Sequence, residues 1–169
     1  MSRLSWIAAA GALALSGLGA AAHAAEPQFK PTACMGDFKD AARKVQCGTL
    51  TVDETRSDAN TRRIRVAVAI VKASAPKAGQ PPVVYLHGGP GGSALDGLPR
   101  MLKSKAALEY VAVDQDWIFI DQRGGGQSSP DLDCPGANLT DAGPPTEKDA
   151  QAIVACMKAF QAQGVNLSR

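Results

Sequence analysis

The pattern of apolar and polar positions predicts two kinds of β-strand in this chain. In Arg62–Val71, Ile64, Val66, Val68 and Ile70 share one side and Arg63 and Arg65 the other, a period of two typical of a half-buried strand. A shorter β-type run, Thr49–Val52, precedes it, and the polar segment Ser57–Asn60 between the two predicts the turn of an antiparallel hairpin. By contrast, Val83–Leu86 and Trp117–Ile120 are continuously apolar, as are strands that are buried on both faces.

Two helices are expected from the same kind of pattern. One lies within Leu95–Leu108, between the two continuous strands, and this strand–helix–strand order predicts a parallel crossover. The other runs over Glu147–Gln163, where Thr146 and Asp149 form a capping-box pair at its start and Gly164 ends it. The predicted fold class is therefore α/β, with an antiparallel hairpin that leads into a parallel sheet flanked by helices.

The composition fits a globular protein of about one domain. The 169 residues are 45% hydrophobic and 20% charged, which provides enough apolar surface to exclude disorder as the main description. Eighteen Lys and Arg against sixteen Asp and Glu leave a net charge of +2. A net charge this small gives no indication of a nucleic-acid-binding protein, which would normally have a basic patch or stripe. We therefore expect no nucleic-acid partner.

Residues 1–24 are expected to be a secretory signal peptide. Arg3 supplies the positive start, Trp6–Ala22 is uncharged and rich in Ala, Leu and Gly, and Ala22–Ala24 offers a small-x-small cleavage site. Because of its glycines, this segment is less apolar than a typical membrane-spanning helix. We therefore expect an exported protein, periplasmic or secreted, without a stable membrane anchor.

The cysteines of the mature chain predict disulfides. Cys34, Cys47, Cys134 and Cys156 are an even number in a chain expected to reach an oxidising compartment. No C-x-x-C pair occurs, so a metal site has little support, and we expect neither metal nor cofactor. Of the three pairings, Cys34–Cys47 with Cys134–Cys156 is expected because it closes two short loops; free buried thiols are the alternative.

A glycine-rich segment follows each continuous strand: His87–Ser93 (HGGPGGS) and Asp121–Pro130 (DQRGGGQSSP). A phosphate-binding P-loop needs a Gly-Lys pair, which the first segment lacks. A dinucleotide-binding fingerprint leads into a helix, whereas the second segment ends in Ser-Ser-Pro. The remaining chemistry is an oxyanion hole, in which backbone N–H groups bind the charge that develops on a carbonyl oxygen.

Together, these two segments resemble those of the prolyl iminopeptidase and tripeptidyl aminopeptidase group of α/β-hydrolases. Cys47–Val52 and Leu132–Cys134 are similar to its exported members, so the resemblance covers the chain from Cys34 onward. It implies an exported serine hydrolase that removes residues from peptide N-termini, with an esterase of the same fold as an alternative. The substrate implied is a peptide or a small ester.

The resemblance also implies roles for individual residues. Gly89 would supply the oxyanion N–H, with support from the rest of its loop: His87, Gly88, Pro90, Gly91 and Gly92. The second segment would be architectural, with an Arg–Asp contact and turns that border the active site; its residues are Asp121, Arg123, Gly124, Gly126 and Ser128.

The catalytic triad of such an enzyme is not recognisable in this sequence. The nucleophile of an α/β-hydrolase lies in a Gly-x-Ser-x-Gly elbow, but Ser93 is followed two residues on by Leu95, and Ser128 by Pro130. His87 is the only histidine after residue 24, and a Ser128–His87 pair would lack the elbow geometry. We therefore expect residues 25–169 to be the N-terminal portion of an α/β-hydrolase domain, truncated before the elbow and inactive alone. A non-catalytic truncated product or binding remnant is the alternative.

One further expectation concerns Val83–Leu86. In the family it resembles, this strand pairs with the strand that carries the nucleophile. We therefore expect an open apolar edge here, and poor solubility as its consequence.

Overall fold

The computed structural model describes residues 26–38, 41–58, 61–89, 91–137 and 144–168. The predicted signal peptide, Pro90 and two residues of the predicted turn, Ala59 and Asn60, lie outside the described residues.

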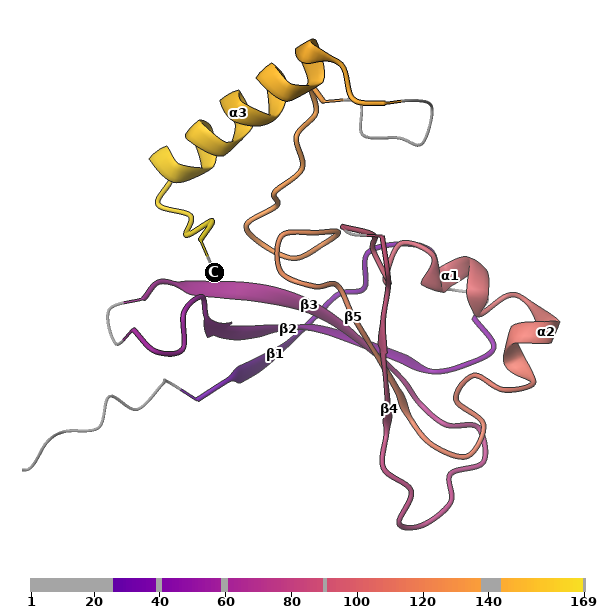
Figure 1. The fold of residues 1–169 in the computed structure, drawn as a ribbon. Coiled ribbons are helices and arrows are strands. Elements are labelled where there is room, and N and C mark those ends of the chain that lie inside the picture. Colours follow the sequence, from indigo (N-terminus) through magenta and orange to yellow (C-terminus); the bar gives the residue numbers. More distant parts are fainter. Residues whose placement is uncertain (1–25, 39–40, 59–60, 90, 138–143, 169) are drawn as a thin grey trace, which may run out of the picture.

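Five strands form one mixed sheet in the order β1-β2-β3-β5-β4 (Figure 1). They are β1 (Gln28–Thr32), β2 (Val45–Asp53), β3 (Arg63–Val71), β4 (Val83–Leu86) and β5 (Trp117–Ile120). Neighbouring strands are antiparallel except for β4 and β5, which are parallel. The predicted hairpin and the predicted parallel pair are thus confirmed, although β2 is longer than the expected Thr49–Val52. That the chain is part of an α/β-hydrolase fold stays a prediction.

Strand β1 was not expected from the sequence. Its five residues, QFKPT, include a proline and one large apolar side chain, and all five are exposed. The strand pairs with β2 along its whole length, with Phe29 opposite Leu50, and the Phe29 ring extends over Gly48. A Cβ at Gly48 would come within 2.4 Å of the Phe29 ring, so the absence of a side chain in β2 makes room for β1.

The hydrophobic core lies on one face of the sheet. Ala67, Ala69 and Val71 of β3 and Phe119 of β5 are buried there beneath the segment that contains α1 and α2. From that segment Leu98 and Leu102, among others, complete the core, both with 0% exposure. Two alanines in the central strand keep this face of the sheet flat enough for a tightly packed layer above it.

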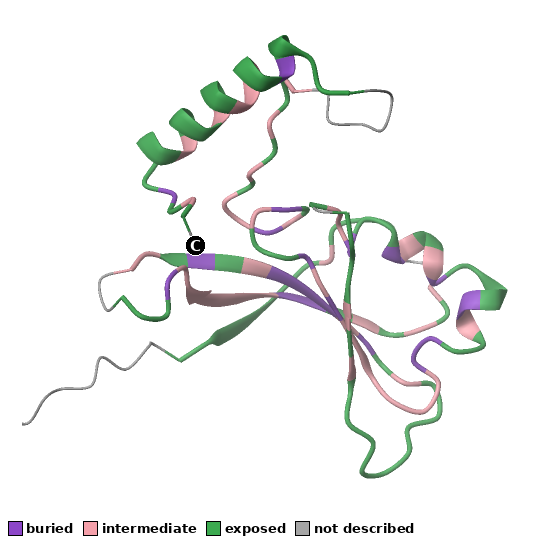
Figure 2. Cartoon of the chain, in the orientation of Figure 1, coloured by how far each residue is buried: buried purple, intermediate pink, exposed green. Residues whose placement is uncertain are grey.

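The opposite face is also apolar but only partly covered. The sequence pattern pointed to this face of β3, which carries Ile64, Val66, Val68 and Ile70. Ile64 and Val68 are buried, whereas Val66 and Ile70 are half-buried (Figure 2). From Val66 to Val71, β3 is therefore apolar on both faces, whereas Arg63 and Arg65 at its start are exposed. In this part of the strand, the more deeply packed face is the one with the alanines.

Strand β4 forms an edge of the sheet in the described part of the chain. Val84 and Leu86 lie on the partly covered face, because they pair in register with Ile118 and Ile120, and they are 54% and 56% exposed. The open apolar edge that the sequence predicted is present, while the poor solubility expected from it stays a prediction.

The helix expected within Leu95–Leu108 is instead two single turns, α1 (Leu98–Met101) and α2 (Lys105–Leu108). The break occurs at Ser104, which has an extended backbone and whose hydroxyl accepts the N–H of Ala107. This N-cap starts a new helix rather than continuing the first.

Helix α3 (Glu147–Ala162) begins at the predicted capping box of Thr146 and Asp149 and lies away from the sheet, with most of its surface exposed (Figures 1 and 2). Two links fix it: a disulfide near its middle, and contacts at its C-terminal end, where Val165 is buried and the Arg62 guanidinium donates to the carbonyl of Gln163.

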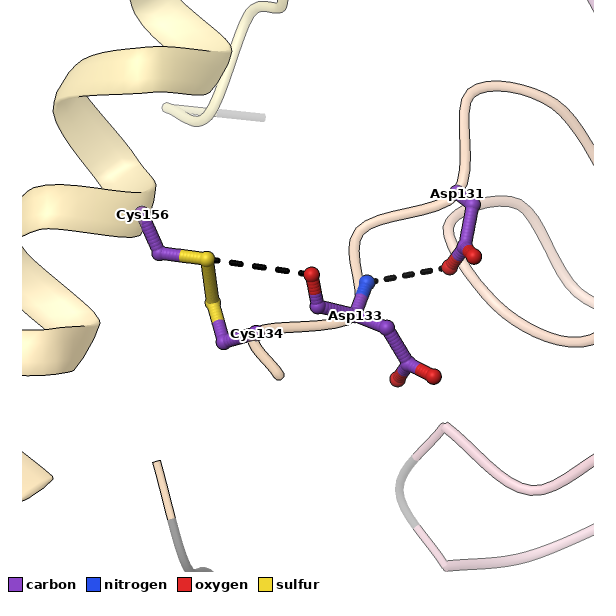
Figure 3. The surroundings of a disulfide bond; sticks show 4 residues. All are labelled: Asp131, Asp133, Cys134 and Cys156. Carbon is purple, nitrogen blue, oxygen red and sulfur yellow. Dashed lines mark hydrogen bonds between the residues drawn. A yellow bond between two sulfur atoms is a disulfide. The ribbon is translucent and has the colours of Figure 1, made fainter. Parts of the chain in front are cut away.

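Both predicted disulfides form. Cys34–Cys47 joins the segment after β1 to the core strand β2, with the Cα atoms 5.1 Å apart. Cys134–Cys156 joins the loop after the second glycine-rich segment to α3, with the Cα atoms 5.8 Å apart (Figure 3). Two disulfides are typical of proteins in an extracellular or other oxidising compartment.

Asp116, just before β5, is expected to make the free energy of unfolding decrease as the pH falls in the acidic range. Its carboxylate pairs with Lys72 and accepts the N–H of Ala73, and these bonds, the Lys72 bond first, hold its pKa below the ordinary aspartate value. A depressed pKa in the folded state stabilises the protein above the unfolded-state pKa, about 4, and this contribution is lost as pH falls further.

In Asp116→Asn we expect that acid-dependent loss to disappear, which urea unfolding between pH 5 and 2.5 measures. The effect should be no more than about 1 kcal/mol because both side chains are partly solvated. Asp114→Asn, which removes the partner of Lys77 on the same turn, is the control. An unchanged pH profile in Asp116→Asn would contradict the assignment.

Candidate functional site

The two glycine-rich segments meet at one edge of the sheet. Because β4 and β5 are parallel neighbours, the loops after them, His87–Ser93 and Asp121–Ser128, leave the sheet at its same end. A cleft of about 530 Å³ lies between them. Its walls are His87, Gly88, Gly89, Gly91 and Gly92 from the first loop, Gln122, Arg123, Gly124 and Gly125 from the second, and Leu132. Clefts at the carboxyl ends of parallel strands are the usual ligand sites of α/β sheets.

The side chain of Asp121 links the two loops. The residue is fully buried, and its Oδ1 accepts the backbone N–H groups of Ala94 (2.6 Å) and Leu95 (3.1 Å). Its Oδ2 accepts the N–H of Gln127 at 2.8 Å, and the Ser93 hydroxyl lies 3.0 and 2.9 Å from the two oxygens. One carboxylate thus holds the end of the first loop against the second.

Ser128 ties the second loop to the sheet. Its buried hydroxyl donates to the carbonyl of Asp121 at 2.6 Å and accepts the N–H of Ala67 in β3 at 2.9 Å. Because the Ser128 hydroxyl both donates to and accepts from backbone groups, its role in the site is structural.

Two glycines are required by this geometry. Gly126 has φ of 56°, and a Cβ there would lie 2.3 Å from the Asp121 carboxylate. Gly89 has φ of 149°, and a Cβ there would lie 2.9 Å from the backbone nitrogen of Gly92. A side chain at Gly126 would displace the carboxylate that joins the two loops, and one at Gly89 would distort the first loop itself.

Gly89 lines the cleft. Among the described residues no acceptor binds its N–H, and Pro90, expected to stiffen the loop, lies outside them. His87 is exposed; its Nδ1 lies 3.3 Å from the hydroxyl of Tyr85, and its carbonyl accepts the Gln122 side-chain amide at 2.9 Å. Gln122 therefore fixes the start of the first loop, a role that the sequence did not indicate.

The expected Arg–Asp contact between Arg123 and Asp121 is not formed. Arg123 Nη1 donates to the backbone carbonyl of Glu54 at 2.8 Å, and the bonds of the Asp121 side chain go to the residues described above. The Glu54 carboxylate accepts two bonds of 2.9 Å from Arg62, and its Oε1 lies 3.3 Å from the N–H of Asn166. Arg123 is thus held by the β2–β3 hairpin instead of by its own loop.

The sequence had indicated neither Glu54 nor Arg62 as part of the site. A local signal existed, because the two residues flank the hairpin turn with opposite charges.

Leu132 connects this cleft to α3. Its N–H bonds to the Gly124 carbonyl at 3.2 Å, and its side chain packs on Gly124, where a Cβ would come within 2.8 Å. Two residues later, Cys134 forms the disulfide with Cys156, and the carbonyl of Asp133 lies 3.7 Å from the Cys156 sulfur (Figure 3). The cleft wall and the helix are therefore covalently connected over a short distance.

The described residues contain no group of three or more His, Cys, Asp or Glu that could hold a metal ion. Within these residues, too, no helix is long and apolar enough to cross a membrane.

Comparison with known proteins points to peptidases. The chain is 31% identical over 112 residues to a tripeptidyl aminopeptidase of Streptomyces lividans, a match that covers 66% of this chain and 21% of that protein. A tripeptidyl aminopeptidase of Streptomyces coelicolor (strain ATCC BAA-471 / A3(2) / M145) matches with the same identity over 66% of this chain and 20% of its own length. No family model matches the chain. The chain spans about a fifth of the length of these curated relatives, and the similarity supports a relationship to peptidases.

Proposed function

We propose that this chain is the oxyanion-loop portion of an exported serine aminopeptidase with an α/β-hydrolase fold, which removes residues from peptide N-termini. The observation that carries the proposal is that Gly89, whose N–H has no acceptor among the described residues, lines the cleft in a loop that Asp121 and Gln122 fix at the carboxyl edge of β4 and β5. The similarity to two tripeptidyl aminopeptidases supports a peptide as the substrate.

The proposed chemistry is the stabilisation of a tetrahedral intermediate. When a nucleophile attacks the scissile carbonyl carbon, negative charge moves to the carbonyl oxygen, and the Gly89 N–H donates to that oxygen. A rigid donor of this kind contributes about 3 kcal/mol to lowering the barrier. The printed sequence contains no Gly-x-Ser-x-Gly motif, so the proposal places the Ser-Asp-His triad in further sequence of the enzyme.

A binding role without catalysis is the second candidate, and one observation favours it. The hydroxyls of Ser93 and Ser128 both bond to Asp121, and the ring of His87 bonds to Tyr85. Neither of these two serines is therefore bonded to His87.

A fluorophosphonate probe, which labels activated serines, tests the proposal. We expect no labelling of the 169-residue chain, and labelling of the protein that also includes the coding sequence downstream of Arg169. That longer protein should release N-terminal residues from peptide substrates faster than it hydrolyses simple esters. Labelling of Ser93 or Ser128 in the 169-residue chain would overturn the proposal, as would a longer protein that stays unlabelled; ester hydrolysis without peptide cleavage would instead identify an esterase.

A further inference from the structure

We propose that Arg123, together with the pocket beside the glycine-loop cleft, forms a subsite for a carboxylate-bearing apolar segment of the peptide substrate. This inference rests on the proposed function, because it assumes that the cleft receives a peptide. It gives Arg123 a part in binding, beyond the architectural role that the sequence implied.

The pocket lies directly beside the glycine-loop cleft. Its volume is about 620 Å³, and it shares Gln122 and Arg123 with that cleft, so the two residues form the boundary between them. The floor is apolar and consists of Leu50, Val52, Val66 and Ile120. These side chains belong to the partly covered face of the sheet, as the pairing of Leu50 with Val66 shows. A peptide whose scissile carbonyl lies at Gly89 would reach this floor by passing over Gln122 and Arg123.

The charges around the pocket favour an anion. Its two acidic residues are already paired: Glu54 with Arg62 at 2.9 Å and Asp53 with Arg63 at 3.3 Å. Arg56 and Arg123 line the same pocket, and neither forms an ion pair within the described residues. The pocket therefore has an apolar floor and a net positive rim, which complements an apolar residue that carries a carboxylate.

The guanidinium of Arg123 is already oriented for binding. One N–H of Nη1 is bonded to the Glu54 carbonyl at 2.8 Å, and that carbonyl is fixed in turn because Arg62 holds the Glu54 side chain. The remaining N–H groups face no acceptor among the described residues. A guanidinium held in this way loses little side-chain entropy when it binds a carboxylate, and such charge-assisted pairs are among the stronger hydrogen bonds.

Binding measurements on the 169-residue chain test the subsite without any need for turnover. Three probes are compared. The first is the acetylated tripeptide alanyl-leucyl-phenylalanine with a free C-terminal carboxylate, and the second is the same tripeptide with a C-terminal amide. The third is a glutamyl-leucyl-phenylalanine amide, whose carboxylate is in a side chain. NMR titration gives the Kd and shows whether the methyl signals of Leu50, Val66 and Ile120 shift. We expect at least one carboxylate probe to bind about tenfold more tightly than the neutral amide. The tighter of the two identifies whether a terminal or a side-chain carboxylate is recognised.

Variants assign the effect to Arg123. In Arg123→Gln the preference for the carboxylate should vanish while the amide binds as before, and Arg123→Lys should restore part of the preference. Arg56→Gln should weaken it by a smaller factor, about threefold. Arg100→Gln, which removes the same charge from α1, is the matched control. Equal Kd values for acid and amide, or an unchanged preference in Arg123→Gln, would overturn the subsite. The fluorophosphonate result decides the proposed function separately, since binding here needs no nucleophile.

Discussion

Replacing Asp121 by asparagine is expected to lower the free energy of unfolding by about 3 kcal/mol and to loosen the contact between the two glycine-rich loops. The carboxylate accepts hydrogen bonds through both oxygens. In either orientation, the amide of asparagine would point its NH₂ group at a backbone N–H, either that of Gln127 or those of Ala94 and Leu95. Because the site is fully buried, water cannot replace the missing acceptor.

Urea unfolding gives the loss of stability, and amide hydrogen exchange locates it. The N–H groups of Ala94, Leu95 and Gln127 should exchange faster in Asp121→Asn, while those of the β2–β3 hairpin keep their protection. Asp96→Asn is the matched control, since Asp96 is an exposed aspartate whose carboxylate, among the described residues, accepts only the Gln127 side chain at 3.1 Å. Equal stability of the two variants would show that Asp121 does not hold the loops together.

Phe119→Ala is expected to cost about 4 kcal/mol, because it removes the largest fully buried side chain of the core. The Phe119 ring lies 5.1 Å from that of Tyr85 and 6.0 Å from that of Trp117, measured between centroids. Alanine would leave a cavity at the centre of the packed face, where the parallel pair of strands meets the segment that contains α1 and α2.

The neighbouring residue provides the comparison for this variant. Ile118→Ala removes an apolar side chain of the same strand from the opposite, partly covered face, where the expected loss is about 2 kcal/mol or less. Thermal and urea unfolding of the two variants measure the difference. A larger loss for Ile118→Ala would mean that the main core lies on the other face of the sheet.

The sequence was most informative where local pattern alone decides the structure. The continuous apolar runs Val83–Leu86 and Trp117–Ile120 became β4 and β5 with the predicted bounds, and the capping box at Thr146 marked the start of α3. Where the outcome depends on packing, the pattern was misleading. The alternation in β3 pointed to Ile64 and its neighbours, yet the alanine face packs more deeply, because whether a face is buried depends on what covers it.

The candidate site shows the same division. The glycine-rich loops could be identified because they follow strands and contain fixed motifs. The bonds that join them, from Asp121 to Ala94 and from Gln122 to His87, link residues distant in sequence and depend on strand register. For the same reason Arg123 could not be assigned its partner: the hairpin brings the Glu54 carbonyl to it, whereas Asp121 is nearer in the sequence.

The two edges of the sheet differ in how readily another strand can pair with them. At one edge every residue of β1 is exposed, and the strand contains Lys30 and Pro31, two residue types that discourage the addition of another strand. At the other edge β4 contains only Val, Tyr and Leu, and its outer backbone groups have no partner strand among the described residues. A further strand, whether from the same polypeptide or from another molecule, would therefore add beside β4 and end next to the His87–Ser93 loop. Among the described residues, the edge that favours a further strand is therefore the edge beside the loop that contains Gly89.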